Sequence, residues 1–119
     1  MVVRVLIVDD AAIFREAARE VLERRGYSVV GEADSAATAM GAIAQLGPDA
    51  ALVDIRLPDS DGFELSANLT RQHPQLAVLL ASADRVPPSP ARVQASGARG
   101  FVLKSRLGGT DLTQFWPGS

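Results

Sequence analysis

Residues 50–62 read AALVDIRLPDSDG, and this stretch decides the fold. The four apolar residues at 50–53 predict a short buried strand that ends at Asp54. Residues 57–62 are typical of a loop, and a helix is expected from about 63 to 73, with Pro74 just beyond it. A buried strand followed by a loop and a helix is the repeating unit of an α/β fold.

The same alternation extends to both sides of this unit. Apolar runs predict strands at 2–8, 27–30, 76–81 and 100–103. Helices are expected at 11–25, after Ser35 to about 46, and at 90–96, where Ser89 is the cap. The last helix, at about 110–115, is weak. Strands alternating with helices in one small domain predict a doubly wound α/β fold with right-handed crossovers.

Composition limits the classes of function. The chain has 119 residues, enough for one domain, and 47% are hydrophobic. The net charge is −2, so no direct nucleic-acid binding is expected. No cysteine is present, which excludes disulfides and thiolate chemistry. The apolar run at the start is too short for a signal peptide or a membrane helix, so we expect a cytoplasmic protein of one domain, residues 1–119, without an effector domain.

Polar side chains stand where four of the predicted strands end. Asp9 and Asp10 follow the first strand, Asp54 the third, Ser82 the fourth and Lys104 the fifth. In an open α/β sheet, ligands bind outside the carboxyl ends of the strands. The fold is therefore expected to bring these five residues together at one edge of the sheet.

The residue types indicate phosphoryl chemistry at a metal ion. Carboxylates gathered in one place repel one another unless a cation lies among them, and oxygen ligands favour Mg²⁺, with Mn²⁺ as an alternative. A carboxylate such as Asp54 can act as a nucleophile toward a phosphoryl group. Lys104 is the single lysine beside eleven arginines, which indicates a site that needs a compact ammonium. Ser82 can donate a hydrogen bond to a phosphoryl oxygen.

Four segments together resemble the receiver domain of two-component response regulators. They are Val8-Asp9-Asp10, residues 52–62, residues 81–83 and residues 97–104, and the resemblance extends over nearly the whole chain. Residues 54–58 and 100–105 are similar to receivers that usually precede a LuxR-type helix-turn-helix domain. The resemblance implies a flavodoxin-like, five-stranded parallel sheet of order 2-1-3-4-5 with helices on both faces.

The resemblance also implies roles for the site. Asp54 would accept a phosphoryl group from a sensor histidine kinase or a phosphotransfer protein. Mg²⁺ would be bound by the side chains of Asp9, Asp10 and Asp54 and by the backbone carbonyl of Arg56. Such a domain is not an enzyme beyond its own phosphotransfer and autodephosphorylation. It switches conformation to change its contacts with a downstream target protein or with a second copy in a homodimer.

The same resemblance assigns the remaining site residues. Lys104 matches the phosphate-binding lysine, and Ser82 with Phe101 matches the pair of switch residues. From the residues alone, the alternative for Ser82 is a buried hydroxyl bonded to the backbone, and for Phe101 a simple core aromatic. Arg56 and Asp84 each lie two residues beyond a site residue, so we expect them to border the mouth of the site and to pair across it.

The sequence departs from the family at its C-terminal third. Ser105 stands where most receivers have proline, so a trans Lys104–Ser105 peptide is expected. Prolines at 87, 88 and 90 predict a fourth helix that starts no earlier than Ser89, and glycines at 108 and 109 weaken the fifth. These helices form the output and dimerisation face in the family, so a nonstandard dimer or partner surface is expected here. Trp116 is predicted to anchor the tail by packing.

Two other classes of function compete with a phosphoacceptor. One is an interaction module that never becomes phosphorylated, although such receivers usually lose a carboxylate or the lysine. The other is a Mg²⁺-dependent phosphatase with an aspartate nucleophile, which usually needs a second acid where this chain has Arg56. A dinucleotide site is excluded because no G-x-G-x-x-G follows the first strand.

Overall fold

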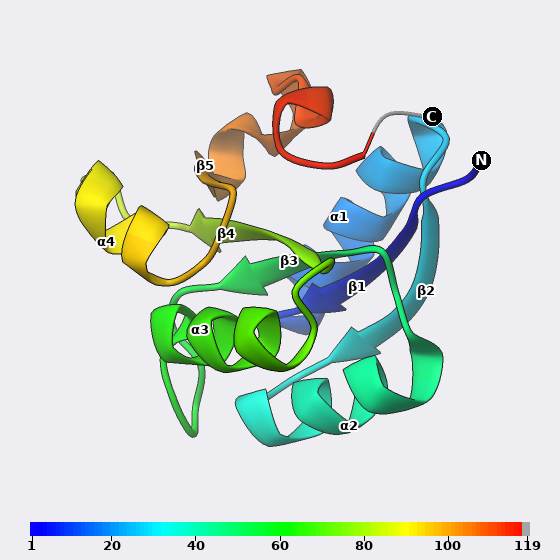
Figure 1. The fold of residues 1–119 in the computed structure, drawn as a ribbon. Coiled ribbons are helices and arrows are strands. Elements are labelled where there is room, and N and C mark those ends of the chain that lie inside the picture. The colour runs from blue at the N-terminus through cyan, green and yellow to red at the C-terminus, as the bar shows by residue number, and fades with distance from the viewer. Residues whose placement is uncertain (118–119) are drawn as a thin grey trace.

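The computed structural model describes residues 1–117 and contains one parallel sheet (Figure 1). Five strands pair in the order β2-β1-β3-β4-β5, which is the order that the resemblance to receiver domains implies. The strands are β1 (Arg4–Val8), β2 (Ser28–Ala33), β3 (Ala50–Asp54), β4 (Ala77–Ser82) and β5 (Gly100–Leu103). Every pairing is parallel, so all carboxyl ends lie at the same edge of the sheet.

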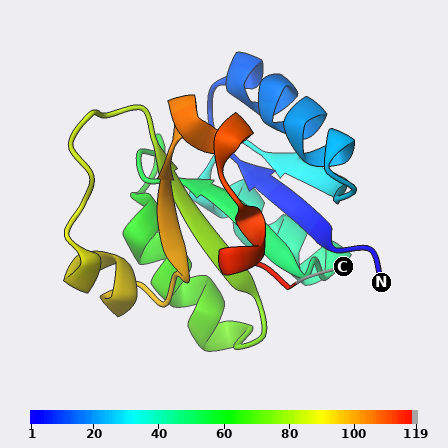
Figure 2. The ribbon, with the colours of Figure 1, turned by 90° about the horizontal axis from the view of Figure 1, so that it is seen from above.

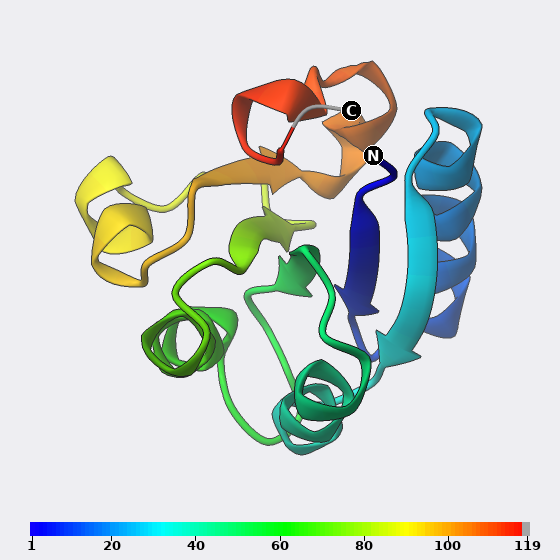
Figure 3. The same ribbon diagram turned by 45° about the vertical axis from the view of Figure 1, so that its right-hand side comes forward.

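Helices cover both faces of the sheet. α2 (Ala36–Leu46) and α3 (Gly62–Gln72) lie on one face, and α1 (Ala12–Arg24) lies on the other (Figure 3). α4 (Pro90–Ala95) lies beside the β5 edge, far from α1 (Figure 2). Within residues 1–117, no helix is long and apolar enough to span a membrane.

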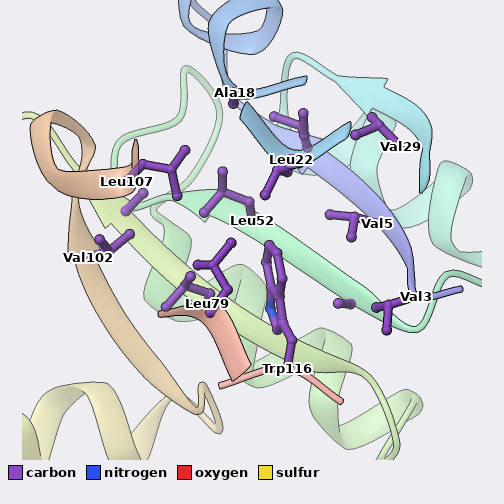
Figure 4. Close-up of a cluster of buried hydrophobic side chains, with 14 of the residues drawn as sticks. Val3, Val5, Ala18, Leu22, Val29, Leu52, Leu79, Val102, Leu107 and Trp116 are labelled. Carbon is purple, nitrogen blue, oxygen red and sulfur yellow. The ribbon is translucent and has the colours of Figure 1, made fainter. Parts of the chain in front are cut away.

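The core consists of two apolar clusters, one on each face of the sheet. Alternate residues of β1 divide between them: Val5 and Ile7 point to the α1 side, and Leu6 and Val8 to the side of α2 and α3. This is the two-faced burial that continuous apolar strands predict. Trp116 reaches into the α1-side cluster and is only 2% exposed, which confirms its predicted role as an anchor (Figure 4).

Local sequence signals explain the helix ends. Ser35 caps α2 and forms a reciprocal capping box with Thr38. Gly47 ends the same helix with a left-handed φ of 55°, a conformation that glycine adopts without steric cost. Ser89 caps α4 with Pro90 in its first turn, as predicted.

The structure corrects the predicted bounds in three places. β1 begins at Arg4, because Val2 is 58% exposed and makes no strand pairing. β2 extends to Ala33, because it remains paired with β1 beyond the predicted end. The α-helix expected at 110–115 does not form, and two 3₁₀ segments, Lys104–Gly109 and Leu112–Gln114, stand in its place.

The glycines at 108 and 109 explain this last difference. They weaken helical propensity, and short 3₁₀ turns suit a stretch fixed mainly by buried side chains. Leu107, Leu112 and Trp116 supply those buried contacts on the α1-side face. The described residues contain no cis peptide bond, so the predicted trans Lys104–Ser105 peptide is confirmed.

Candidate functional site

Four of the five polar residues predicted to converge lie together at the carboxyl edge of the sheet. Asp9 directly follows β1, Asp54 ends β3, and Lys104 directly follows β5. Asp9, Asp10 and Asp54 each place a carboxylate oxygen within 4.8 Å of the others. The Lys104 Nζ lies 2.6 Å from Asp9 Oδ2 and 3.2 Å from Asp54 Oδ2. The topology therefore gathers three carboxylates and one ammonium from three strand ends.

Burial makes the negative charges of this cluster unfavourable unless cations lie beside them. Asp9 is fully buried and Asp54 is 7% exposed, whereas Asp10 is exposed to solvent. Apart from its ion pair with Lys104, Asp9 Oδ2 makes no hydrogen bond with any described residue. One ammonium faces three carboxylates, so the cluster retains an excess of negative charge. A hard divalent cation fits this donor set, because all of its ligand atoms are oxygens.

The pKa values of two site residues are shifted in the same direction. Burial raises the pKa of the Asp54 carboxyl, and the charge of Asp9 adds to the rise, although the Arg56 N–H and Lys104 oppose it. Burial alone would lower the pKa of Lys104, but its contacts with Asp9 and Asp54 outweigh burial and raise that pKa. Lys104 therefore stays protonated, and it lies beside the Asp54 carboxyl, whose ionised form is destabilised by burial.

At Gly62 the backbone of α3 lies very close to the backbone of Asp54, the candidate nucleophile. A Cβ built at Gly62 would lie 2.3 Å from the backbone oxygen of Asp54, so only glycine permits this packing. The Gly62 N–H donates to the Ile55 carbonyl at 2.9 Å. Asp61, the N-cap of α3, accepts a hydrogen bond from the Glu64 N–H. The glycine of the LPDSDG loop thus sets the distance between α3 and β3.

The matching pattern of the response regulator receiver domain family covers residues 5–113. The chain belongs to this family. As a receiver domain, it carries the acidic cluster at the expected strand ends and the lysine opposite it.

Known relatives agree with this assignment. The receiver is 34% identical over 103 residues to the response regulator GacA of Pseudomonas viridiflava, covering 86% of this chain and 48% of that protein. It is 40% identical over 103 residues to the transcriptional regulatory protein NarL of Mycobacterium tuberculosis strain H37Rv, with the same coverage. The chain therefore spans about half the length of these curated relatives.

Solved structures show the same fold. The signal receiver domain of the response regulator NarL from Mycobacterium tuberculosis superposes with a TM-score of 0.76 at 37% identity, covering 95% of this chain and 89% of that one. A LuxR-family response regulator from Aurantimonas superposes with a TM-score of 0.81 at 31% identity, covering 88% and 76%. Such receivers are signalling modules, and this chain is similar to those of the NarL and LuxR group.

The remaining predicted site residues take the following positions. Ser82 is buried, and its Oγ accepts a hydrogen bond of 3.0 Å from the Asp84 N–H. Phe101 is half-buried and packs against the cluster on the α2 and α3 side. Arg56 Nη2 lies 2.6 Å from Asp84 Oδ2, so the pair expected from sequence is present, with side chains 77% and 44% exposed.

Three contacts of the site were not predicted from the sequence. The Lys104 Nζ lies 4.4 Å from the centre of the Phe14 ring, a cation–π contact. Arg15 donates to the backbone carbonyl of Asp9 at 2.7 Å. Asp59 accepts hydrogen bonds from the Ala36 and Ala37 N–H groups, at 2.8 and 3.0 Å. Phe14 stands in the sequence as one apolar residue of a helix, and no local signal connects Asp59 with the start of α2.

Proposed function

We propose that this receiver accepts a phosphoryl group on Asp54 within a two-component phosphorelay and changes its protein contacts in response. The observation that carries the proposal is the position of Asp54, whose Oδ2 lies 3.2 Å from the Lys104 ammonium beside the buried Asp9. The donor is a phosphohistidine of a sensor kinase or of a phosphotransfer protein. Phosphotransfer and autodephosphorylation are the only reactions that the domain accelerates.

The chemistry follows from the groups at the site. A carboxylate oxygen of Asp54 attacks phosphorus as the phosphorus–nitrogen bond of the donor breaks, and the imidazole leaves with the bonding electrons. Lys104 stays protonated and neutralises charge on the transferred group. Ser82 keeps its hydroxyl proton free for a phosphoryl oxygen, because its Oγ already accepts from Asp84.

Asp9, Asp10 and Asp54 would hold Mg²⁺, with the backbone carbonyl of Arg56 as a further ligand. Mn²⁺ suits the same oxygen donors. When bound, the cation supplies charge neutralisation for the carboxylates and the phosphoryl oxygens. The excess negative charge around Asp9 Oδ2 supports this assignment.

Ser82 and Phe101 form the proposed switch. A phosphoryl group on Asp54 attracts the Ser82 hydroxyl, and the half-buried Phe101 ring moves toward the space that this leaves. Leu80 of β4 pairs with Phe101 of β5, and Ser82 pairs with Leu103, so the two strands carry both groups side by side. The response is a shift between two populated conformations.

The Arg56–Asp84 pair is proposed to slow the access of hydrolytic water to the phosphorylated Asp54. Asp84→Ala removes the pair and is expected to shorten the lifetime of the phosphorylated form by a few fold. Its decay is followed by release of inorganic phosphate. Arg56→Ala should give the same shortening, because it breaks the same contact. An unchanged lifetime in both variants would contradict the role of the pair, which adds little stability at such exposure.

The proposed setting is the bacterial cytoplasm, with residues 1–119 acting as one receiver unit. Its partners are the kinase or phosphotransfer protein and, for output, a target protein or a second receiver. No direct contact of these residues with nucleic acid is proposed.

Intact mass spectrometry tests the proposed function. The protein is incubated with Mg²⁺ and a small phosphodonor such as phosphoramidate, and a mass increase of one phosphoryl group is expected. Asp54→Asn should show no increase, and chelation of Mg²⁺ should abolish labelling of the wild type. Labelling that persists in Asp54→Asn, or a wild type that stays unlabelled with Mg²⁺, would overturn the assignment.

A further inference from the structure

Arg15 of α1 connects the acidic cluster with the neighbouring strand β2. Its Nη1 donates to the backbone carbonyl of Asp9 at 2.7 Å, and its Nε donates to Glu32 Oε1 at 2.9 Å. The two side chains of this ion pair are only 19% and 30% exposed. α1 packs against β1 and β2 on one side of the sheet, which brings both acceptors within reach (Figure 3). One guanidinium thus binds a carbonyl of the site and a carboxylate outside it.

Each polar group of Asp9 has a defined partner. Its N–H donates to the Ala33 carbonyl, its Oδ1 accepts from the Ala11 N–H, and its Oδ2 faces the Lys104 ammonium. The remaining group, the backbone carbonyl, accepts from Arg15. Of these four contacts, the one with Arg15 acts on the peptide bond that leads to the next residue.

That peptide bond sets the direction of Asp10, the exposed member of the acidic cluster. The carbonyl of Asp9 and the N–H of Asp10 lie in one rigid plane, so a hydrogen bond to the carbonyl also orients the N–Cα bond of Asp10. The Asp10 carboxylate takes part in no ion pair among residues 1–117. One of its oxygens nevertheless lies within 4.8 Å of an oxygen of Asp9 and of Asp54. The backbone, rather than an ion pair, therefore holds the carboxylate in the cluster.

Glu32 holds the guanidinium of Arg15 in place and balances its charge. Burial alone would raise the pKa of Glu32, but hydrogen bonds from Arg19 and Arg15 outweigh burial and lower that pKa. Arg19 binds Oε2 of the same carboxylate and the Val29 carbonyl, and neither acceptor belongs to the acidic cluster. Two arginines thus share one carboxylate, and Arg15 is the one that also binds Asp9.

We propose that Arg15 is a positioning residue for the metal site and acts through the peptide bond between Asp9 and Asp10. By holding the Asp9 carbonyl, it keeps the Asp10 carboxylate beside that of Asp54. The inference rests on the proposed function and adds to it a residue that is itself no metal ligand. Its effect has a distinctive sign. Removing a positive charge near a cation site by itself strengthens cation binding, whereas loss of a positioned ligand weakens it.

The dissociation constant of Mn²⁺ tests the inference, measured on the unphosphorylated full chain from the electron paramagnetic resonance signal of the free ion. Arg15→Met should bind Mn²⁺ about tenfold more weakly than the wild type. Arg15→Lys keeps the charge and a donor for the carbonyl, so it should recover part of this loss. Arg19→Met is the matched control, because it removes the same charge beside Glu32 but leaves the contact with Asp9. Its affinity should stay within about twofold of the wild type.

The rate of labelling of Asp54 by phosphoramidate supplies a second readout. Arg15→Met should need about tenfold more Mg²⁺ for half-maximal labelling. It should approach the wild-type rate at saturating Mg²⁺, because Lys104 and Asp54 keep their contact. Arg15→Gln should show the same weakening of Mn²⁺ binding, so the test does not depend on the folding of one variant. Urea denaturation checks that each variant is folded under the conditions used.

Two results would overturn the inference. One is unchanged or tighter Mn²⁺ binding in both neutral variants of Arg15. The other is an equal loss in Arg15→Met and Arg19→Met, which would assign the effect to the shared pairing with Glu32. Neither result alters labelling of Asp54 in the wild type. A wild type that binds Mn²⁺ but is never labelled would instead refute the phosphoacceptor role and leave the role of Arg15 intact.

Discussion

Replacing Lys104 by methionine is expected to lower the free energy of unfolding by about 3 kcal/mol at pH 7 in the absence of Mg²⁺. The Lys104 Nζ lies 2.6 Å from Asp9 and 3.2 Å from Asp54, and its side chain is only 16% exposed. Methionine keeps the length of the side chain but removes the charge. The buried Asp9 carboxylate then has no cation beside it, and removing one partner of a buried pair costs about 3–5 kcal/mol.

Protonation sets an upper limit on this loss. The variant can always neutralise one carboxyl, whose ordinary pKa is 3.8. At about 1.36 kcal/mol per pH unit, protonating it at pH 7 costs roughly 4 kcal/mol, and at pH 5 it costs roughly 2 kcal/mol. The folded variant binds one proton more than its unfolded chain, so its deficit relative to the wild type shrinks as the pH falls.

Urea denaturation followed by the fluorescence of Trp116, the one tryptophan, measures the effect. The experiment is run at pH 5 and pH 7, with chelator and with Mg²⁺. Mg²⁺ should recover part of the loss, because a cation again lies among the carboxylates. Arg99→Met, which removes an exposed charge, should change stability by less than about 0.5 kcal/mol. A loss that is equal at both pH values and indifferent to Mg²⁺ would refute the electrostatic reasoning.

Three further outcomes are expected. Asp59→Ala should lower the melting temperature at pH 7, because the Ala36 and Ala37 N–H groups then lose the carboxylate that accepts from them. These hydrogen bonds lower the pKa of Asp59 in the folded state. The difference in melting temperature is therefore present above pH 3.8 and is lost as the pH falls through the pKa of Asp59 in the folded state. Gly62→Ala should cost about 1–3 kcal/mol in urea denaturation and slow labelling of Asp54, because its Cβ forces α3 away from β3. Trp116→Ala should cost about 3–5 kcal/mol by circular dichroism, and Trp116→Phe clearly less, because Nε1 has no hydrogen-bond partner within residues 1–117. Equal losses for the two tryptophan variants would contradict this account.

Sequence reasoning located the site because its residues follow directly from strand ends. In a parallel sheet every strand brings its carboxyl end to the same edge, so Asp9, Asp54 and Lys104 needed no contact information to be placed together. The same reasoning could not find Asp59, whose partners Ala36 and Ala37 lie more than twenty residues away. It also predicted a helix at 110–115, where the structure has a 3₁₀ segment whose conformation is fixed by the burial of Leu112 and Trp116.

The sequence by itself determined the order of strands and helices and the identity of the groups at the site, because apolar periodicity and chain direction are local properties. The tertiary structure decided how those groups behave. The raised pKa of Asp54 depends on burial and on the charge of Asp9, which only folding brings near. The pairing of arginines is decided in the same way: Arg15 forms an ion pair with Glu32 across the fold, whereas Arg99 forms none with any of residues 1–117. Electrostatic energy depends on the distance between charged groups and on their burial, and the spacing of residues along the chain determines neither.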